Sequence, residues 1–570
     1  MTAGTAAVAA FLVGIASNLA QVAILRFFLG EFYGTELHLG MLLALWLFGI
    51  AAGGWLSGAW KIPAQSVLLV ATVSPVLSIL AFLGGSALIL PQMTGQYLPF
   101  MPVCAVMALA VLPLALPVGA LIPSLVVDCS ANDASAFDCL FALESAGGAA
   151  GGLLFAGLAG GSAETASLML ACLILSGTAL TAVLKGHQKL LSATMLLIIP
   201  LAASQSGHLQ KMMNDFLWRK FHVGYDLAEA FDSPYQSIKI AKYGNQYSLF
   251  LDQNLSVTWP DVPLSEQRIH SFLSCVPDKL SGEESRMLLV GIPSPDLLME
   301  CLKYRNMRIS VADLDERLLK HMQQLSPKDE RIEWLTVDPR AYLRRNPGLF
   351  DAIIVLSSDP TTLIGNRLFT RDALREAVTA LSDTGVLDYS VSGAENYLGG
   401  DLSQVVLSLH RDIFAVAGEV VPVPGDPIHF RASRCRNVIA TSPRELADRF
   451  ARRGIRTESF RPELFADIFQ PFRVSELRKW LASDAAAPVN TDVRPAALAR
   501  QLHLWDIYSG SGTRSWLRKI EGIGLWPAII CIIILYIIFS AVVAGNSSGC
   551  IHDAACSRIA RGIWFFRNRG

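Results

Sequence analysis

The first third of this 570-residue chain contains very few charged side chains. Residues 1–206 hold only 11 of the 95 charged residues in the sequence, whereas about one residue in four is charged in an ordinary soluble protein. The rest of the chain carries a normal share of charge. The composition therefore predicts a membrane region followed by a soluble region.

Other features that would mark a class of function are also missing. The net charge is −1 at pH 7, which argues against a protein that binds nucleic acid through phosphate contacts. The 10 cysteines and 10 histidines form no CxxC pair and no HExxH motif, so neither a structural zinc site nor a disulfide framework is predicted. The sequence thus assigns no metal and no nucleic-acid partner.

Long apolar runs dominate the first region. A helix needs about 20 mainly apolar residues to cross a bilayer, and seven stretches meet or approach this length: 5–29, 36–59, 65–91, 99–126, 139–161, 164–184 and 190–206. The seventh is short, so we expect six to seven crossing helices. An eighth stretch, Gly524–Ala544, contains the run IICIIILYIIF. These runs indicate a multi-pass protein of the cell (inner or plasma) membrane, with the lipid bilayer as a partner.

The residues that flank these apolar stretches do not determine how the protein is oriented in the membrane. The first stretch lacks the basic N-terminal segment of a cleavable signal peptide. Under an eight-helix count, seven basic residues flank the helices on each side. Because a bias in basic residues is what sets orientation, the side of the membrane on which the soluble region lies stays open.

Small residues and one acid mark the fifth stretch. The run ESAGGAAGGLLFAGLAGG, Glu144–Gly161, repeats small residues four positions apart, a spacing that lets helix backbones approach closely in lipid. Glu144 is the membrane-embedded candidate for a functional residue, because an acid within lipid is costly and often marks a polar pathway. The other interpretation is a carboxylate near the interface that bonds to a neighbouring helix.

From about Asp226 the pattern changes to short β-like runs. Residues 233–252 indicate two or three strands with a turn near Gly244. Strands and helices then alternate, with apolar strands expected at 286–291, 308–312, 332–336, 352–355 and 385–390. Such alternation predicts a doubly wound parallel sheet with ligands at the carboxyl ends of its strands. The expected fold is a polytopic helical membrane region, a small β part, a Rossmann-like α/β domain and one C-terminal transmembrane helix.

Acidic residues follow three of the expected strands. Asp313 and Asp315 end the second strand, Asp338 ends the third, and Asp359 follows the fourth. A carboxylate after the second strand of such a sheet commonly binds a pair of ribose hydroxyls. The three positions in register favour a nucleoside site.

Together these residues resemble the polyamine aminopropyltransferases (spermidine synthases), and more closely their membrane-fused relatives. The resemblance rests on the order and spacing of SPYQSIKI, LFLD, ADLD, VDPRAYL, FDAIIVLSSDPTT, NRLFTRDALREAV, PGDPIHFRAS and VNTDVRP, and on helical runs such as FALESAGGAAGGLLFAGL. Composition, the apolar runs and this resemblance together predict a membrane domain at 1–206, a linker and small β subdomain at 207–285, a synthase-like domain at 286–520, a transmembrane helix at 521–546 and a basic tail at 547–570.

The resemblance also implies a set of ligand-binding residues. Gln236 matches a nucleoside-side glutamine, Asp313 the acid that binds ribose, and Asp338 the acid near adenine. Asp359 matches an acid that contacts the diamine. Asp296 is the one acid retained in the loop after the first strand of the domain, where it would face a cationic ligand.

The departures from the family pattern are more telling than the matches. The catalytic aspartate that opens the DxxDP motif is replaced by Leu356, which cannot accept a proton. The glycine-rich loop GGGDGG reads GIPSPD, Gly291–Asp296, in which two prolines remove amide donors. The YxE motif reads SEQ at Ser265–Gln267, and the tyrosine of a later Pro-Tyr segment corresponds to Val423.

The leading hypothesis is a membrane protein whose synthase-like domain is a degenerate ligand-binding or protein-interaction module without standard aminopropyl transfer. No catalytic residue and no cofactor is assigned, although the resemblance implies an S-adenosylmethionine-type nucleoside or a polyamine as ligand. One alternative is an active transferase that uses decarboxylated or intact S-adenosylmethionine. Another is a transporter with a regulatory soluble domain.

Overall fold

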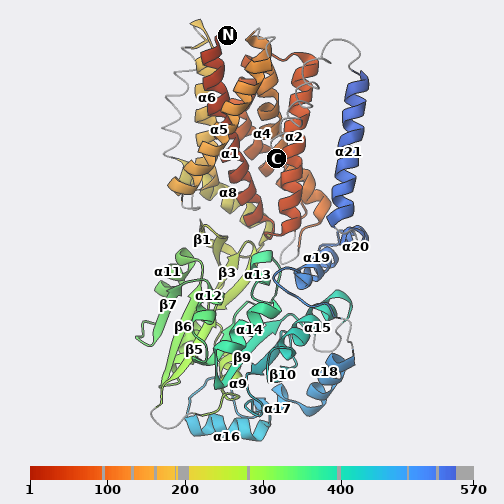
Figure 1. Cartoon of the computed structure of the whole chain (residues 1–570). Helices are drawn as coiled ribbons and strands as arrows, with labels where there is room; N and C mark the ends of the chain where they lie inside the picture. The colour runs from red at the N-terminus through yellow and green to blue at the C-terminus, as the bar shows by residue number, and fades with distance from the viewer. Residues whose placement is uncertain are drawn as a thin grey trace.

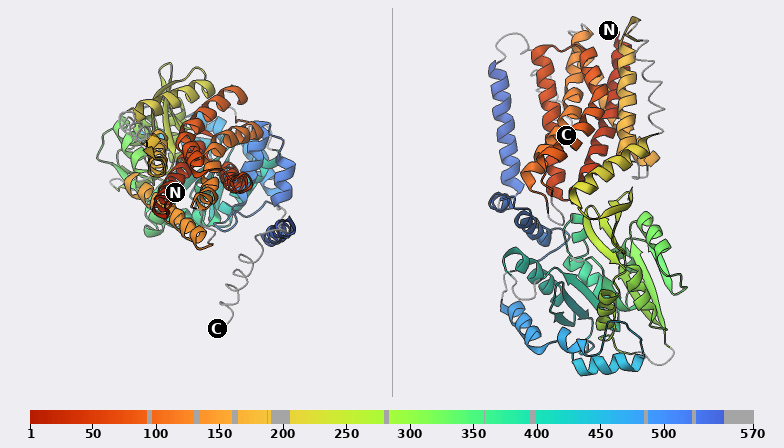
Figure 2. Two further views of the ribbon diagram at one scale, coloured as in Figure 1. Left: turned by 90° about the horizontal axis from the view of Figure 1, so that it is seen from above. Right: turned by 180° about the vertical axis from the view of Figure 1, so that it is seen from behind.

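The computed structural model describes residues 1–92, 97–129, 134–159, 164–186, 188–189, 205–278, 283–357, 359–393, 399–483, 487–521 and 525–546. A bundle of long helices forms one end of the molecule, and an α/β domain forms the other (Figure 1). A single long helix near the C-terminus stands beside the bundle in the same view and in the view from behind (Figure 2).

Among the described residues, six helices make up the bundle and are long and apolar enough to cross a membrane. They are α1 (Ala3–Glu31), α2 (Glu36–Trp60), α3 (Ala64–Ile89), α4 (Phe100–Asp128), α5 (Ala134–Ala159) and α6 (Thr165–Val183). The first six predicted stretches are thereby confirmed, and α21 (Leu525–Asn546) coincides with the eighth. Nearly all of the seventh, 190–206, and the tail at 547–570 lie outside the described residues.

Glycines bring the helix backbones of the bundle into direct contact. A Cβ atom at Gly147 of α5 would lie well inside van der Waals distance of the Phe11 carbonyl oxygen of α1, and one at Gly14 of α1 would meet the Glu144 carbonyl oxygen. Gly53 of α2 and Gly119 of α4 pack against the facing backbone in the same way. The close packing predicted from the small residues of the fifth stretch is therefore confirmed for α1 and α5.

The chain enters the α/β domain through α8 (Ser206–Phe221) and a small antiparallel sheet. Four strands pair in sequence order: β1 (Asp226–Asp232), β2 (Ser237–Tyr243), β3 (Gln246–Leu251) and β4 (Asn254–Trp259). The predicted turn lies between β2 and β3, where Gly244 has a φ of 59° that a residue without a Cβ adopts at little cost.

A seven-stranded sheet in the order β10-β11-β9-β8-β5-β6-β7 forms the centre of the domain. Its strands are β5 (Ser285–Val290), β6 (Met307–Asp313), β7 (Ile332–Thr336), β8 (Phe350–Val355), β9 (Leu381–Val391), β10 (Glu419–Val423) and β11 (Ile428–Ser433). The five predicted strands are β5 to β9, and they pair in parallel. The predicted parallel sheet is therefore confirmed, and it is extended at one edge by β10 and β11, an antiparallel hairpin that was not predicted and that pairs with β9.

Helices cover both faces of this sheet, so that its central strands are buried on both sides. The helices of the domain are α9 (Val262–Leu273), α10 (Pro295–Leu302), α11 (Glu316–Leu325), α12 (Pro339–Arg345), α13 (Leu363–Asn366), α14 (Arg371–Ala380), α15 (Gly400–Phe414), α16 (Pro443–Arg453), α17 (Leu464–Ile468), α18 (Pro471–Ser483), α19 (Ala496–Ser509) and α20 (Arg514–Glu521). The strand order reverses between β5 and β8, which is where ligands bind in sheets of this kind.

The bundle is held to the domain by polar contacts at the end of α1 and the start of α2. Glu31 pairs with Lys239 of β2 at 2.5 Å and accepts a hydrogen bond from Gln253 at 2.7 Å. Arg26 donates to the carbonyl oxygen of Ser233 at 2.9 Å, and the Glu36 carboxylate accepts a hydrogen bond from the Leu363 amide of α13. The carboxyl ends of β5, β6 and β8 therefore face the bundle (Figure 1).

Candidate functional site

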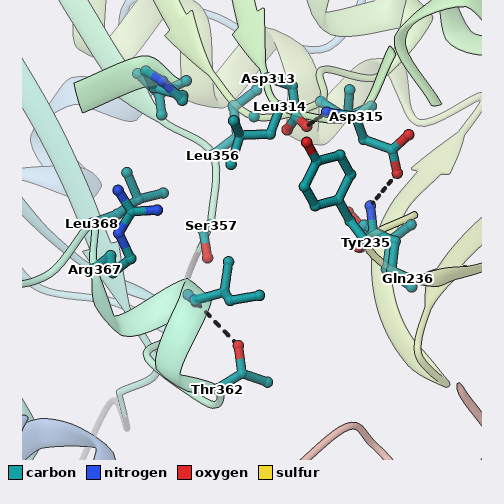
Figure 3. A pocket seen from close by; sticks show the side chains of 18 of the residues that line it. Tyr235, Gln236, Asp313, Leu314, Asp315, Leu356, Ser357, Thr362, Arg367 and Leu368 are labelled. Carbon is teal, nitrogen blue, oxygen red and sulfur yellow. Dashed lines mark hydrogen bonds between the residues drawn. The ribbon is translucent and has the colours of Figure 1, made fainter. Parts of the chain in front are cut away.

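A cavity of about 290 Å³ lies at the carboxyl ends of β5, β6 and β8, where the strand order predicts a ligand. Figure 3 shows Tyr235 and Gln236 reaching into this first cavity from one side, with Arg367, Leu368 and Thr362 on the other. Asp313 and Asp315 lie together at the end of β6 (Figure 3). Gln236, Asp313 and Asp338, three of the residues that the resemblance implies, line this one cavity.

A hydrogen bond links Asp313 and Asp315 across the turn after β6. The Asp315 amide donates to Asp313 Oδ1 at 2.8 Å. Asp315 itself caps α11 by accepting from the Leu318 amide at 3.1 Å, and its second oxygen accepts from Gln236 Nε2 at 3.1 Å. Burial raises the pKa of Asp313 to about 6, because the charged form loses its water.

Asp252 is a third acid of the cavity and was not selected from the sequence. It follows β3, and its Oδ1 accepts from the Ser237 amide at 2.8 Å. Burial raises its pKa to about 7. The signal in the sequence was the short polar residue that ends the LFLD segment, because aspartate is frequent in turns. The structure places a turn there, with φ values of 47° at Asp252 and 67° at Gln253. Within the described residues none of Asp252, Asp313 and Asp315 forms a salt bridge with a basic side chain.

Asp338 lies at the edge of the cavity with its charge balanced. Its Oδ1 caps α12 by accepting from the Arg340 amide at 3.0 Å, and its Oδ2 pairs with Arg367 at 3.0 Å. Arg340 also lines the cavity, but its guanidinium is bound to Glu376 and Asp492 at 2.8 Å each. Arg367 is thus neutralised by Asp338, and Arg340 is neutralised by Glu376 and Asp492.

Two of the departures from the family pattern, Leu356 and Gly291 of the altered loop, line the first cavity. Leu356, which the resemblance aligns with the family's catalytic aspartate, follows the end of β8 and lines the wall of the cavity. Gly291 has a φ of 96° and is followed by Pro293 and Pro295, the second of which opens α10. Neither proline has an N–H to offer a ligand.

Two residues singled out from the sequence lie away from the first cavity. Asp296 is buried at the start of α10, where its Oδ2 accepts from the Asp261 amide at 2.6 Å. Glu144 is half-buried in α5, and its backbone, rather than its carboxylate, meets Gly14 of α1.

Asp359 lines a different cavity, of about 110 Å³, between the bundle and the domain. Its carboxylate accepts hydrogen bonds from the amide of Ser392 at 3.0 Å, from the Ser392 hydroxyl at 2.5 Å and from Gln501 Nε2 at 3.4 Å. Burial raises the pKa of Asp359 above its usual range. The structure thus separates Asp359 from Asp313 and Asp338, with which the sequence grouped it.

Glu266, His270 and Glu300 form a buried cluster whose ligand atoms lie within 4.8 Å of one another. This cluster already contains a cation, because Lys303 Nζ lies 2.6 Å from Glu300 Oε2 and 3.5 Å from Glu266 Oε1. Glu266 also accepts three backbone hydrogen bonds from residues 458–460, and His270 bonds to Glu300 at 2.9 Å. The cluster therefore ties α9 and α10 to the segment after α16.

Comparison with known proteins points to one family for the α/β domain. Residues 266–425 match the model of the spermine/spermidine synthase domain. Among curated proteins, polyamine aminopropyltransferase 2 of Aquifex aeolicus is 25% identical over 235 residues, which cover 37% of this chain and 46% of that protein. The polyamine aminopropyltransferase of Ruegeria sp. is 24% identical over 215 residues, covering 35% of this chain and 74% of that protein. The chain thus spans about half the length of the first of these relatives.

Solved structures of similar proteins include a spermidine synthase in complex with the transition state analogue AdoDATO, with 19% identity and a TM-score of 0.38 over 45% of this chain and 88% of that one. Spermidine synthase from Thermotoga maritima has 17% identity and a TM-score of 0.36 over 45% of this chain and 87% of that one. On the family model and the curated relatives, the chain carries a spermidine synthase-like domain, joined to six helices that are long and apolar enough to cross a membrane.

Proposed function

We propose that this chain is an integral membrane protein whose synthase-like domain binds a cationic ligand and does not carry out standard aminopropyl transfer. The observation that supports the proposal is the first cavity itself. Asp252, Asp313 and Asp315 line it without a salt bridge to a basic side chain among the described residues, although Lys239 and Arg26 act electrostatically on Asp252. Leu356 occupies the wall where the family has its catalytic acid. The cavity attracts a positive charge and offers no proton acceptor at that position.

The residues of the cavity fit an S-adenosylmethionine-type nucleoside, with a polyamine as the other ligand of suitable charge. Asp313 ends β6, the position from which a carboxylate binds ribose hydroxyls in sheets of this kind. Gln236 lies beside it, held by Asp315. A bound nucleoside of this type would supply a sulfonium cation, which the three carboxylates would stabilise electrostatically.

The same residues argue against the parent reaction. Transfer to an amine requires a base that removes the proton of the attacking ammonium group, and loss of a positioned acid or base costs about 10²–10⁴ in rate. Leu356 cannot take this role, and the acids of the cavity lie at the end of β6, in the turn after β3 and at the start of α12 instead. We therefore propose that the domain binds its ligand and that a protein partner recognises the ligand-bound form.

Binding to the full-length chain in lipid nanodiscs tests this proposal. We expect calorimetric titration to show binding of S-adenosylmethionine, weaker binding of the uncharged methylthioadenosine, and at least about a tenfold loss of S-adenosylmethionine affinity in Asp313→Asn. Asp383→Asn is the matched control, because Asp383 is exposed far from the cavity.

If S-adenosylmethionine, methylthioadenosine and spermidine all fail to bind, the proposed ligand binding is overturned and only a role with protein partners is left. Turnover of decarboxylated S-adenosylmethionine and putrescine, lost in Asp313→Asn, would instead establish the alternative of an active transferase. Glu144→Gln tests the transporter alternative, which requires substrate flux in proteoliposomes that falls in this variant.

Affinity for a cationic nucleoside should depend on pH in a predictable direction. The pKa values of Asp313 and Asp252 are raised to about 6 and about 7, so both acids are mostly ionised at pH 8 and mostly protonated at pH 5.5. A cation binds the ionised form, and we therefore expect affinity to fall by about tenfold or more between these pH values. Methylthioadenosine carries no sulfonium charge and should show a flatter profile; equal profiles for the two ligands would contradict the proposed role of the carboxylates.

A further inference from the structure

Helix α8 lies at the end of the bundle that faces the α/β domain (Figure 1). The side chain of Gln210 accepts a hydrogen bond from the Ala166 amide, near the start of α6, at 3.1 Å. Lys220 Nζ donates to the carbonyl oxygen of Ala87, near the end of α3, at 2.7 Å. In a bilayer crossed by α3 and α6, α8 would therefore lie at the depth where the hydrocarbon core gives way to the headgroups.

One side of α8 is buried within the molecule. Met213 and Leu217 pack into the apolar core of the bundle. Trp218 packs on the small sheet, where its ring meets that of Phe250 edge to face with centroids 5.1 Å apart. These contacts fix how the helix is turned about its axis, and so they determine which side chains face outward.

The outward side of α8 carries a row of three large apolar side chains, which we call the outer stripe. It consists of Leu209, Met212 and Phe216, which are 42%, 57% and 42% exposed, respectively. With 3.6 residues per turn, the outer stripe borders the side of Met213 that packs on the bundle, whereas Lys211 borders the side of Trp218 that packs on the sheet. The outward surface of α8 thus changes from apolar to charged in the direction from the bundle to the domain.

Basic residues border the outer stripe on both sides. Arg219 follows it on the side of the domain, and Lys220 follows it on the side of the bundle. Among the described residues, the side chains of Lys211 and Arg219 have no salt-bridge or hydrogen-bond partner. The helix contains three lysine and arginine residues and one acid, Asp215, and Glu164 approaches its first turn. Positive charge therefore exceeds negative charge along α8.

We propose that α8 is an interfacial helix that binds anionic phospholipids. The outer stripe enters the boundary between acyl chains and headgroups, as the apolar side of such helices does, and Arg219 and Lys211 bind lipid phosphate groups. The order of apolar and charged side chains on α8 matches the order of acyl chains and headgroups in a leaflet. The inference goes beyond the proposed function, which assigns no lipid class and no lipid-binding surface, and it rests on the part of that function that places the bundle in a bilayer.

The test is photo-crosslinking of the full-length chain in nanodiscs that contain equal amounts of phosphatidylglycerol and phosphatidylcholine. With p-benzoylphenylalanine in place of Met212, we expect mass spectrometry to detect lipid adducts, with phosphatidylglycerol in about fivefold excess. Arg219→Gln should lower this excess about three- to fivefold, whereas Arg478→Gln on α18 should leave it unchanged. The same crosslinker in place of Phe472, which is 70% exposed on α18 at the far end of the domain (Figure 1), should give no lipid adduct.

A crosslinker in place of Leu47, which is 65% exposed on α2, separates this inference from the placement of the bundle. Lipid adducts at Leu47 but not at Met212 would overturn the role of α8 and leave the membrane bundle standing, and adducts at neither position would overturn both. A crosslink from Met212 to a second copy of the chain, or equal adducts of the two lipids, would also overturn the inference. Phe216 provides a second position if the Met212 variant does not fold. S-adenosylmethionine binding on the same samples reports the first cavity independently.

Discussion

Replacing Lys239 with methionine should destabilise the protein by about 3–5 kcal/mol, because it leaves Glu31 buried without its cation. Glu31 and Lys239 are 4% and 2% exposed, respectively. They join the end of α1 to the centre of the small sheet at 2.5 Å. Gln253 also donates to Glu31, but a neutral amide cannot balance the carboxylate. We expect thermal unfolding in nanodiscs to begin at a markedly lower temperature, with earlier proteolysis between α8 and β1.

A double variant and a surface pair provide the controls. Lys239→Met combined with Glu31→Met removes both charges and should recover most of the lost stability, because an apolar pair of similar volume can replace a buried ion pair. Lys320→Met breaks the surface pair of Lys320 and Glu316, whose side chains are 68% and 61% exposed, respectively. This change should lower the free energy of unfolding by less than about 1 kcal/mol. A double variant no more stable than the Lys239→Met variant would show that shape, rather than charge balance, holds this junction.

The second large effect is expected in the bundle, from Gly147→Ala. The added Cβ would be forced against the Phe11 carbonyl oxygen, and that neighbour is backbone that cannot rotate away. Overpacking of this kind costs about 1–3 kcal/mol and occasionally more. We expect a lower yield of folded protein and a lower unfolding temperature in nanodiscs.

Gly157→Ala on the same helix is the matched control. A Cβ at Gly157 meets nothing within 4 Å. Alanine is favoured over glycine within a helix by about 1 kcal/mol, so this variant should be neutral or slightly stabilised. If Gly147→Ala behaves in the same way, α1 and α5 are not packed backbone to backbone.

The parallel strands could be predicted from the sequence because their signals are local. Residues 286–291, 308–312 and 332–336 are apolar runs set between helical segments, and β5, β6 and β7 coincide with them to within one or two residues. The hairpin of β10 and β11 was missed, because it breaks the regular alternation of strand and helix on which the prediction depended. The helices of the bundle were also predictable, since length and apolar composition alone define them.

The site could be predicted only in part, because its geometry depends on contacts between distant segments. Asp313 and Asp338 follow from their strand ends, whereas the direction in which Asp359 points depends on Ser392 and Gln501, the latter 142 positions away. The pair of Glu31 and Lys239 spans 208 positions, and neither residue has a local signal that identifies the other. The cavity that Asp359 lines combines segments from both parts of the chain, and only the segment around Asp359 belongs to a motif recognised in the sequence.

The carboxyl ends of the central strands face the helical bundle, and the Glu36 contact to α13 brings the first cavity close to the ends of those helices. If the six helices cross a bilayer, as proposed, this position would lie near the lipid headgroups, within reach of an electrostatic potential that extends about 8 Å at physiological ionic strength. A leaflet with a surface potential of about −30 mV concentrates a monovalent cation about threefold and lowers the local pH by about half a unit. More ligand would then meet fewer ionised carboxylates, so lipid composition would adjust occupancy of the cavity without any lipid touching the ligand.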